Sequence, residues 1–181
     1  MLTTVLRLSF CALVAIAPQA GVLLANARSA PAPAASPSPT PIPLFQPIIS
    51  KLLSETSVPL LLPTLVPVNP SAEVTPVASL NDTDANGYEV DLNATSGCSG
   101  QGCFIGLIKS IPAIGPIDLS DFSYYQTATL ANGITAIVGN PSYRNPTTIV
   151  WNQSGRRYIL VLIVANFPQD LVNMANSMTQ Y

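Results

Sequence analysis

Apolar and polar residues alternate with a period of two over much of the second half of the chain, which predicts β-strands. The clearest case is residues 88–92, where three apolar side chains alternate with two acidic ones. Further strands are predicted at residues 72–80, 104–108, 124–131, 134–138, 147–151 and 157–165. Pro76 places the first of them at a sheet edge or a bulge, because proline cannot donate to a central ladder. Residues 158–164 are apolar on both faces, so this strand is expected to be central and covered on both sides.

Two short turns indicate how these strands pair. Asn132-Gly133 separates two of the predicted strands, and this dipeptide is the strongest short signal for a hairpin. Residues 152–155, which end in a glycine, separate two more. Successive hairpins predict one antiparallel sheet of six or seven strands.

Helical periodicity occurs on either side of the strand region. Residues 45–56 place apolar side chains on one face and predict a short amphipathic helix that docks on the main domain. Residues 168–178 predict a C-terminal helix, with Pro168 in its first turn and an apolar stripe for one face of the sheet. Between them, prolines recur every three or four residues in 58–70 and predict an extended strap. Strap and N-terminal helix are expected to cover the other face.

The resulting fold class is α+β, organised as a single domain over residues 58–181 behind a short helix at 44–57. At this length one domain can bury a substantial core.

The first 27 residues have the pattern of a secretory signal peptide. Arg7 precedes an apolar run at 8–17, and Ala25-Asn26-Ala27 fits a cleavage site. Residues 28–43, rich in Pro, Ala and Ser, then predict an extended, disordered linker. An uncleaved membrane anchor is the alternative, but Pro18 interrupts the run before the length that a span needs. We therefore expect a secreted protein, periplasmic or extracellular, with no stable membrane span after signal cleavage.

Composition narrows the function classes. Only 9% of the 181 residues are charged and seven are basic, which disfavours binding to nucleic acid. The chain has no histidine, which excludes catalysis by a Ser-His-Asp triad or a Cys-His pair. No nucleotide-binding or zinc-ligand motif occurs, and we expect neither cofactor nor metal.

Cys98 and Cys103 lie in a glycine-rich loop with four residues between them. In an exported protein, this arrangement most simply predicts one structural disulfide. A redox-active pair is the alternative, but such pairs favour two intervening residues at a helix N-terminus.

Three groups of acids are the candidates for chemistry. Glu89 and Asp91 project from one face of a predicted strand, where they could serve as an acid–base pair or form a solvated face. Asp82 and Asp84 resemble the start of a calcium loop but lack its later glutamate, which favours a plain turn. Asp118 and Asp121 follow a Pro/Gly loop, and a carboxylate-only hydrolase would use them or the first pair.

The candidate binding surface is apolar. Ile111, Ile114 and Ile117 lie in a Pro/Gly stretch that predicts either a cover for the core or an exposed contact. Tyr124 and Tyr125 follow nearby and could line a groove, or be half-buried sheet residues.

The chain resembles a group of exported bacterial proteins of unknown function that is common in cyanobacteria. The residues that carry the resemblance are Val58-Pro to Leu62-Pro, Gly87-Tyr-Glu-Val90, Cys98 with Cys103, Ala131-Asn-Gly-Ile134, Thr148-Ile-Val-Trp151, Gly155-Arg-Arg-Tyr158 and Leu171–Ser177. More distantly, the strand–turn–strand–helix ending is similar to domains of envelope-sensing regulators. The resemblance implies an α+β fold and export, and it supplies no catalytic residues.

These patterns together predict a non-catalytic exported domain that binds a partner protein, a peptide or a small apolar ligand in the cell envelope. A purely structural envelope component and a carboxylate-only hydrolase are the alternatives.

Overall fold

The computed structural model describes residues 42–67, 75–95, 102–141, 147–163 and 168–181. The predicted signal peptide, all but the last two residues of the predicted linker, and Cys98 lie outside the described residues. Export and the disulfide between Cys98 and Cys103 therefore stay predictions. None of the helices in the described ranges is long and apolar enough to cross a membrane.

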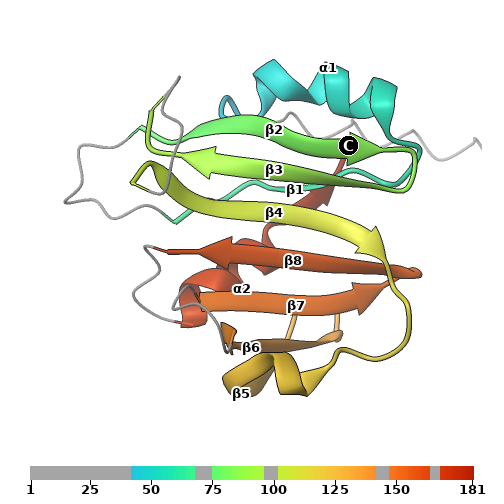
Figure 1. Cartoon of the computed structure of the whole chain (residues 1–181), viewed down its shortest axis with the longest axis vertical. Helices are drawn as coiled ribbons and strands as arrows, with labels where there is room; N and C mark the ends of the chain where they lie inside the picture. The colour runs from blue at the N-terminus through green and yellow to red at the C-terminus, as the bar shows by residue number, and fades with distance from the viewer. Residues whose placement is uncertain (1–41, 68–74, 96–101, 142–146, 164–167) are drawn as a thin grey trace, which may run out of the picture. The chain divides into compact units, whose positions relative to one another are not determined.

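A seven-stranded antiparallel sheet forms the centre of the fold, in the order β2-β3-β4-β8-β7-β6-β5 (Figure 1). Its strands are β2 (Val77–Asp84), β3 (Gly87–Asn93), β4 (Phe104–Pro112), β5 (Phe122–Thr129), β6 (Thr135–Pro141), β7 (Thr147–Gln153) and β8 (Arg156–Leu162). Since α1 (Gln46–Glu55) and α2 (Pro168–Asn176) accompany this sheet, the predicted α+β class is confirmed.

A second, two-stranded sheet joins the two ends of the described chain. β1 (Leu61–Pro63) lies in the predicted strap and pairs with β9 (Met178–Gln180), which the sequence analysis did not anticipate. The Tyr88 hydroxyl donates to the carbonyl of Leu61 at 2.8 Å and accepts from its amide at 3.1 Å. The strap is thereby fixed to the large sheet, and burial raises the pKa of the Tyr88 hydroxyl.

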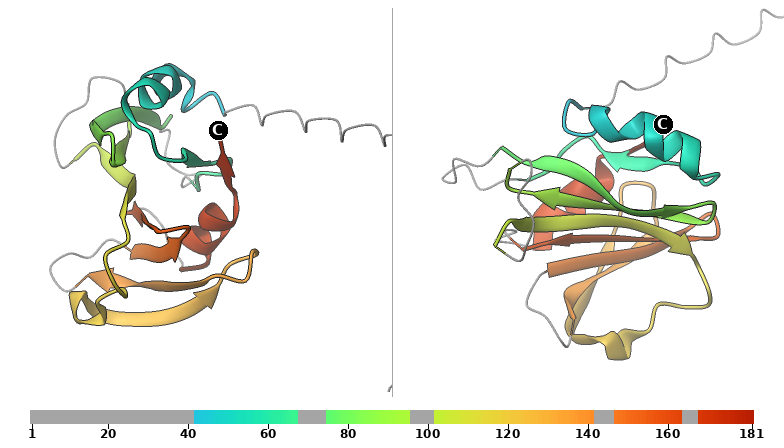
Figure 2. Two further views of the ribbon diagram at one scale, coloured as in Figure 1. Left: turned by 90° about the vertical axis from the view of Figure 1, so that its right-hand side faces the viewer. Right: turned by 45° about the horizontal axis from the view of Figure 1, so that its top comes forward.

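The core lies on one face of the large sheet. Buried residues from α1, β1 and α2 pack there in one cluster with β3, β4, β7 and β8, and Figure 2 (left) shows α2, β1 and β9 on the same side of the sheet. At its centre, the rings of Trp151 and Tyr158 stack with centroids 5.3 Å apart. Both side chains are fully buried, so this stack is a main contributor to hydrophobic stabilisation.

Both predicted hairpin turns are confirmed. Gly133 has φ +80°, and the Leu130 amide donates to the Ile134 carbonyl at 2.8 Å across the turn. Ser154 and Gly155 both have positive φ, as a tight hairpin between β7 and β8 requires. β2 begins directly after Pro76 at the edge of the sheet and contains a bulge between Leu80 and Asp82.

The expected layering and some boundaries were wrong. Strap and N-terminal helix pack on the same face as α2, so the outer face of β8 is only half-buried at Ile159 and Val161. Long neighbouring side chains such as Lys109 and Arg157 can cover part of such a surface with their alkyl stems. β2 and β4 continue past their predicted ends at residues 80 and 108, because residues 81–84 and 109–112 extend their ladders, and β2 begins only at Val77.

Candidate functional site

β5 is one of the two edge strands of the large sheet and lies at the lower end of the sheet in Figure 1. Its eight residues, Phe-Ser-Tyr-Tyr-Gln-Thr-Ala-Thr, include no charged residue and no proline. Most of them are exposed, including Tyr124 at 64% and Tyr125 at 42%. Natural edge strands are usually short, charged, interrupted by proline or covered, so β5 is an unusual edge.

The backbone of β5 presents a row of hydrogen-bonding groups to solvent. Its ladder with β6 continues to Leu130, whose amide donates to Ile134. In an antiparallel pair, alternate residues turn their N–H and C=O toward the partner, here the even-numbered ones. Tyr125, Thr127 and Thr129 therefore direct both groups away from β6. We call this side of the strand the open edge of β5.

The beginning of β5 is shaped by a bulge between Phe122 and Tyr124. Next to the bulge, Gly139 pairs with Tyr125, and a Cβ at Gly139 would collide with the Tyr124 carbonyl oxygen, so only glycine allows this approach. Phe122 and Tyr125 then meet edge to face, with ring centroids 6.5 Å apart. This contact orders Tyr125 beside the open edge.

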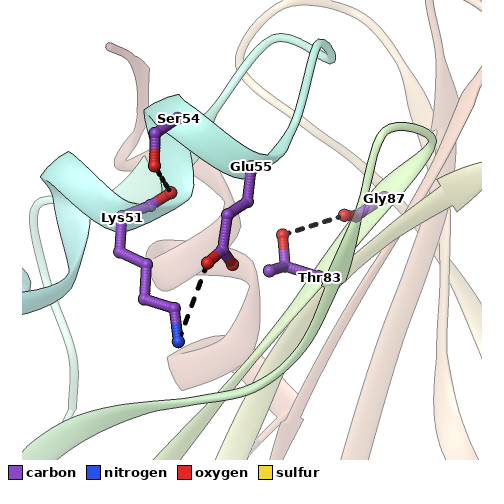
Figure 3. A network of polar contacts seen from close by, with 5 residues as sticks. All are labelled: Lys51, Ser54, Glu55, Thr83 and Gly87. Carbon is purple, nitrogen blue, oxygen red and sulfur yellow. Dashed lines mark hydrogen bonds and ion pairs between the residues drawn. The ribbon is translucent and has the colours of Figure 1, made fainter.

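The opposite edge strand, β2, has the protection that β5 lacks. It contains the acids Asp82 and Asp84, and α1 lies alongside it (Figure 1). The Ser57 hydroxyl, just after α1, donates to the Ala85 carbonyl at 2.7 Å in the β2–β3 turn. Figure 3 shows further polar contacts here: the Lys51–Glu55 pair on α1, 3.8 Å apart, and the Thr83 hydroxyl at 3.4 Å from the Gly87 carbonyl.

The apolar stretch is divided between a strand and a loop. Ile111 belongs to β4, where it pairs with Arg157, so the prediction of a strand that ends at residue 108 was wrong there. Ile114 is 87% exposed and Ile117 is half-buried in the loop that leads to the 3-10 turn η1 (Leu119–Asp121) and β5. Ile114 does not cover the core, because its side chain projects into solvent.

Arg157 anchors this loop to the β7–β8 hairpin. Its guanidinium donates to the carbonyls of Gly115 and Pro116 at 3.0 and 2.8 Å and to the Asn152 side chain at 3.1 Å. The Ala113 amide also donates to the Gly155 carbonyl at 2.9 Å. The loop that presents Ile114 is thus held by backbone contacts and by the planar fork of one arginine.

Replacement of Arg157 by alanine is expected to loosen the loop. Three hydrogen bonds from one cation are lost, so the Ala113 amide should exchange faster and the free energy of unfolding should fall by about 1 kcal/mol. Hydrogen exchange at residues 113–117 measures the effect. Arg157→Lys is the control, because lysine keeps the charge but not the fork. Unchanged exchange in Arg157→Ala would show that the arginine does not anchor the loop.

The structure does not gather the five predicted binding residues into one groove. The pairing of Tyr124 with Asn140 and of Tyr125 with Gly139 places the two tyrosines on opposite faces of β5. What they share is the open edge between them. Thr127 and Thr129 complete this edge and were missed, because their contribution is their backbone.

The carboxylates on β3 already have partners. Glu89 lies 2.5 Å from the Lys109 ammonium and accepts from the Asn81 amide at 2.7 Å. Burial and the neighbouring Glu89 raise the pKa of Asp91 on the same face. Within the described ranges, no cluster of three or more acids or cysteines has a geometry that could hold a metal ion.

One acid in each of the other two groups stabilises a turn, whereas Asp82 lies in β2 opposite Glu89 and not in the predicted turn. Asp84 accepts from the Asn86 amide at 2.6 Å in the β2–β3 turn. Asp118 accepts from the amide and hydroxyl of Ser120 at 2.9 and 2.7 Å, and these bonds lower the pKa of Asp118. Asp121, the last residue of η1, is exposed. The acids beside these turns therefore have a structural use.

Two surface cavities of the described chain are small. One, of about 150 Å³, lies beside the β5–β6 turn and has Trp151 in its wall. The other, of about 130 Å³, lies by the β2–β3 turn and includes Glu89 and Lys109. Sites for drug-sized ligands typically enclose roughly 300–1,000 Å³, so both cavities are smaller than such a site.

An antiparallel α+β domain with one protected and one open sheet edge is the class that this geometry defines. Comparison of the chain with protein-family models, curated proteins and solved structures finds no match. Its function is therefore argued from the geometry of the site.

Proposed function

We propose that this chain is an exported, non-catalytic domain of the cell envelope that binds an extended segment of a partner protein along the open edge of β5. The observation that carries the proposal is the contrast between the two edges. β2 has acids and an adjacent helix, whereas β5 has eight uncharged residues and no covering helix among the described residues. Export rests on the leader sequence of residues 1–27.

Strand addition supplies both affinity and selectivity. The amides and carbonyls of Tyr125, Thr127 and Thr129 would bond the backbone of the added strand, which gives affinity for any extended segment. Tyr125 on one face and Tyr124 on the other would then contact its alternating side chains. The absence of charge on β5 favours a segment that is uncharged where it pairs.

The arrangement of the acids favours a binding domain over a carboxylate-only hydrolase. Glu89 is paired with Lys109, and Asp118 accepts hydrogen bonds from Ser120. Asp91, the carboxyl with the raised pKa, does not line the cavity that contains Glu89. A hydrolase built on these residues would need a carboxyl of raised pKa inside a cleft.

A blocked peptide of alternating side chains, Thr-Tyr-Thr-Gln-Thr-Tyr-Thr, tests the proposal. We expect it to bind the purified protein with a dissociation constant on the order of 1 mM or tighter, measured by fluorescence anisotropy of a labelled copy. Thr127→Pro should abolish binding, because it removes an amide that points to the open edge and leaves the ladder with β6 intact.

Gln126→Pro is the matched control for that variant. The Gln126 amide points toward β6, so this proline should destabilise the fold, whereas Thr127→Pro should remain folded by circular dichroism. A second control places proline at the centre of the peptide and leaves the protein unchanged. Equal binding by the peptides with and without proline would contradict strand addition.

A further inference from the structure

We infer that the partner at the open edge of β5 is a second copy of this chain, bound as an antiparallel β5–β5 pair about a two-fold axis at Thr127. This inference rests on the proposed function and names the occupant of the same edge. The two sheets would then continue into one another across the axis. Such an interface is isologous, the commonest arrangement in soluble oligomers.

The spacing of the outward backbone groups fits this register. With Thr127 opposite Thr127 of the partner subunit, Tyr125 lies opposite the partner's Thr129, and Thr129 lies opposite the partner's Tyr125. All three residues direct N–H and C=O to the open edge, so each pair can exchange two hydrogen bonds. The two-fold register therefore uses every outward group between Tyr125 and Thr129.

The side chains are complementary in the same register. On the outer face, threonine meets threonine and tyrosine meets threonine, and both kinds of pair stabilise antiparallel sheets. On the other face, Tyr124 lies opposite Leu130 of the partner subunit, and Gln126 opposite the partner's Ala128. Leu130 is only 4% exposed, so the exposed side chains on this face are Tyr124, at 64%, and Gln126.

Charge does not oppose this pairing. β5 contains no charged residue, and the chain has a formal net charge of only −2, so two copies repel each other weakly. The nearest acids, Asp118 and Asp121, precede the strand and would lie at the two outer ends of the pair. The same pairing at β2 would bring Asp82 and Asp84 of two chains together.

Opposite charges at the two-fold axis test the inference. Thr127→Lys alone and Thr127→Glu alone place like charges directly opposite each other and should each raise the dimer dissociation constant about fivefold. An equimolar mixture of the two variants should form a heterodimer and recover most of the loss. Sedimentation equilibrium over a range of concentrations measures the dissociation constant of each purified variant and of the mixture. Ser79→Lys, at an exposed position of β2, is the matched control and should leave dimerisation unchanged.

The outcomes separate this inference from the proposed function. A protein that stays monomeric while the alternating peptide still binds at β5 overturns the dimer and leaves strand addition in place. A dimer that Thr127→Lys and Thr127→Glu do not weaken uses another surface and also overturns the inference. A monomer that binds no peptide overturns both.

Discussion

Replacement of Trp151 by alanine is expected to remove most of the stability of the fold. The indole is fully buried, stacks on Tyr158 and donates from Nε1 to the Gln153 side chain at 3.2 Å. Truncation of a buried tryptophan typically costs about 3–5 kcal/mol, out of a total stability of about 5–15 kcal/mol for such domains. Urea denaturation followed by circular dichroism measures the loss.

Ile114→Ser is the matched control for this experiment. Ile114 is 87% exposed, so its replacement should change the free energy of unfolding by less than about 0.5 kcal/mol. A large loss in Ile114→Ser would show that the loop packs on the core. An unchanged midpoint in Trp151→Ala would contradict the placement of the core on that face of the sheet.

Replacement of Gly106 by alanine is expected to cost about 3 kcal/mol, at the upper end of the usual cost of overpacking. Gly106 lies in β4, opposite Leu162 of β8. A Cβ at this position would collide with the Val161 carbonyl oxygen and would lie 2.9 Å from the Leu162 side chain. Because that carbonyl belongs to the backbone of the neighbouring strand, it cannot move away without disturbing the ladder.

Gly102→Ala separates this collision from a general effect of glycine replacement. A Cβ at Gly102 would have no neighbour within 4 Å, and its backbone does not adopt positive φ. Thermal unfolding should therefore give a midpoint close to that of the unchanged protein for Gly102→Ala and a clearly lower one for Gly106→Ala. Equal midpoints would show that β4 and β8 are not as close as described.

Local patterns were sufficient to predict the individual hairpins and the fold class. Asn132-Gly133 specifies a turn by its own conformational preferences, and Gly133 has the positive φ that such a turn needs. The alternation around Val90 reports which side of β3 is buried. Both signals are contained within a few residues of chain, so sequence alone reveals them.

The layering of the fold depends on contacts between distant residues. A stripe of apolar residues on α1 shows that the helix docks, but not on which face of the sheet. β4 pairs with β8 across a long connection, and β1 with β9 across most of the domain. Such partners are chosen by the packing of the whole core, which periodicity does not report.

The candidate site was predictable only in part for the same reason. Tyr124 and Tyr125 were candidates for the lining of a groove from their residue type, with half-buried sheet residues as the alternative. Their common role at the open edge depends on β5 being terminal in the strand order. Thr127 and Thr129 carry no side-chain signal of binding, since backbone groups are present in every strand.

Amide-resolved nuclear magnetic resonance during titration with the alternating peptide tests strand addition at β5 most directly. The account predicts that, at a dilution where the protein is monomeric, the amides of Tyr125, Thr127 and Thr129 shift and become protected from exchange, while those of β2 do not change. Binding that leaves these three amides unchanged, or protection that appears on β2 instead, would contradict it.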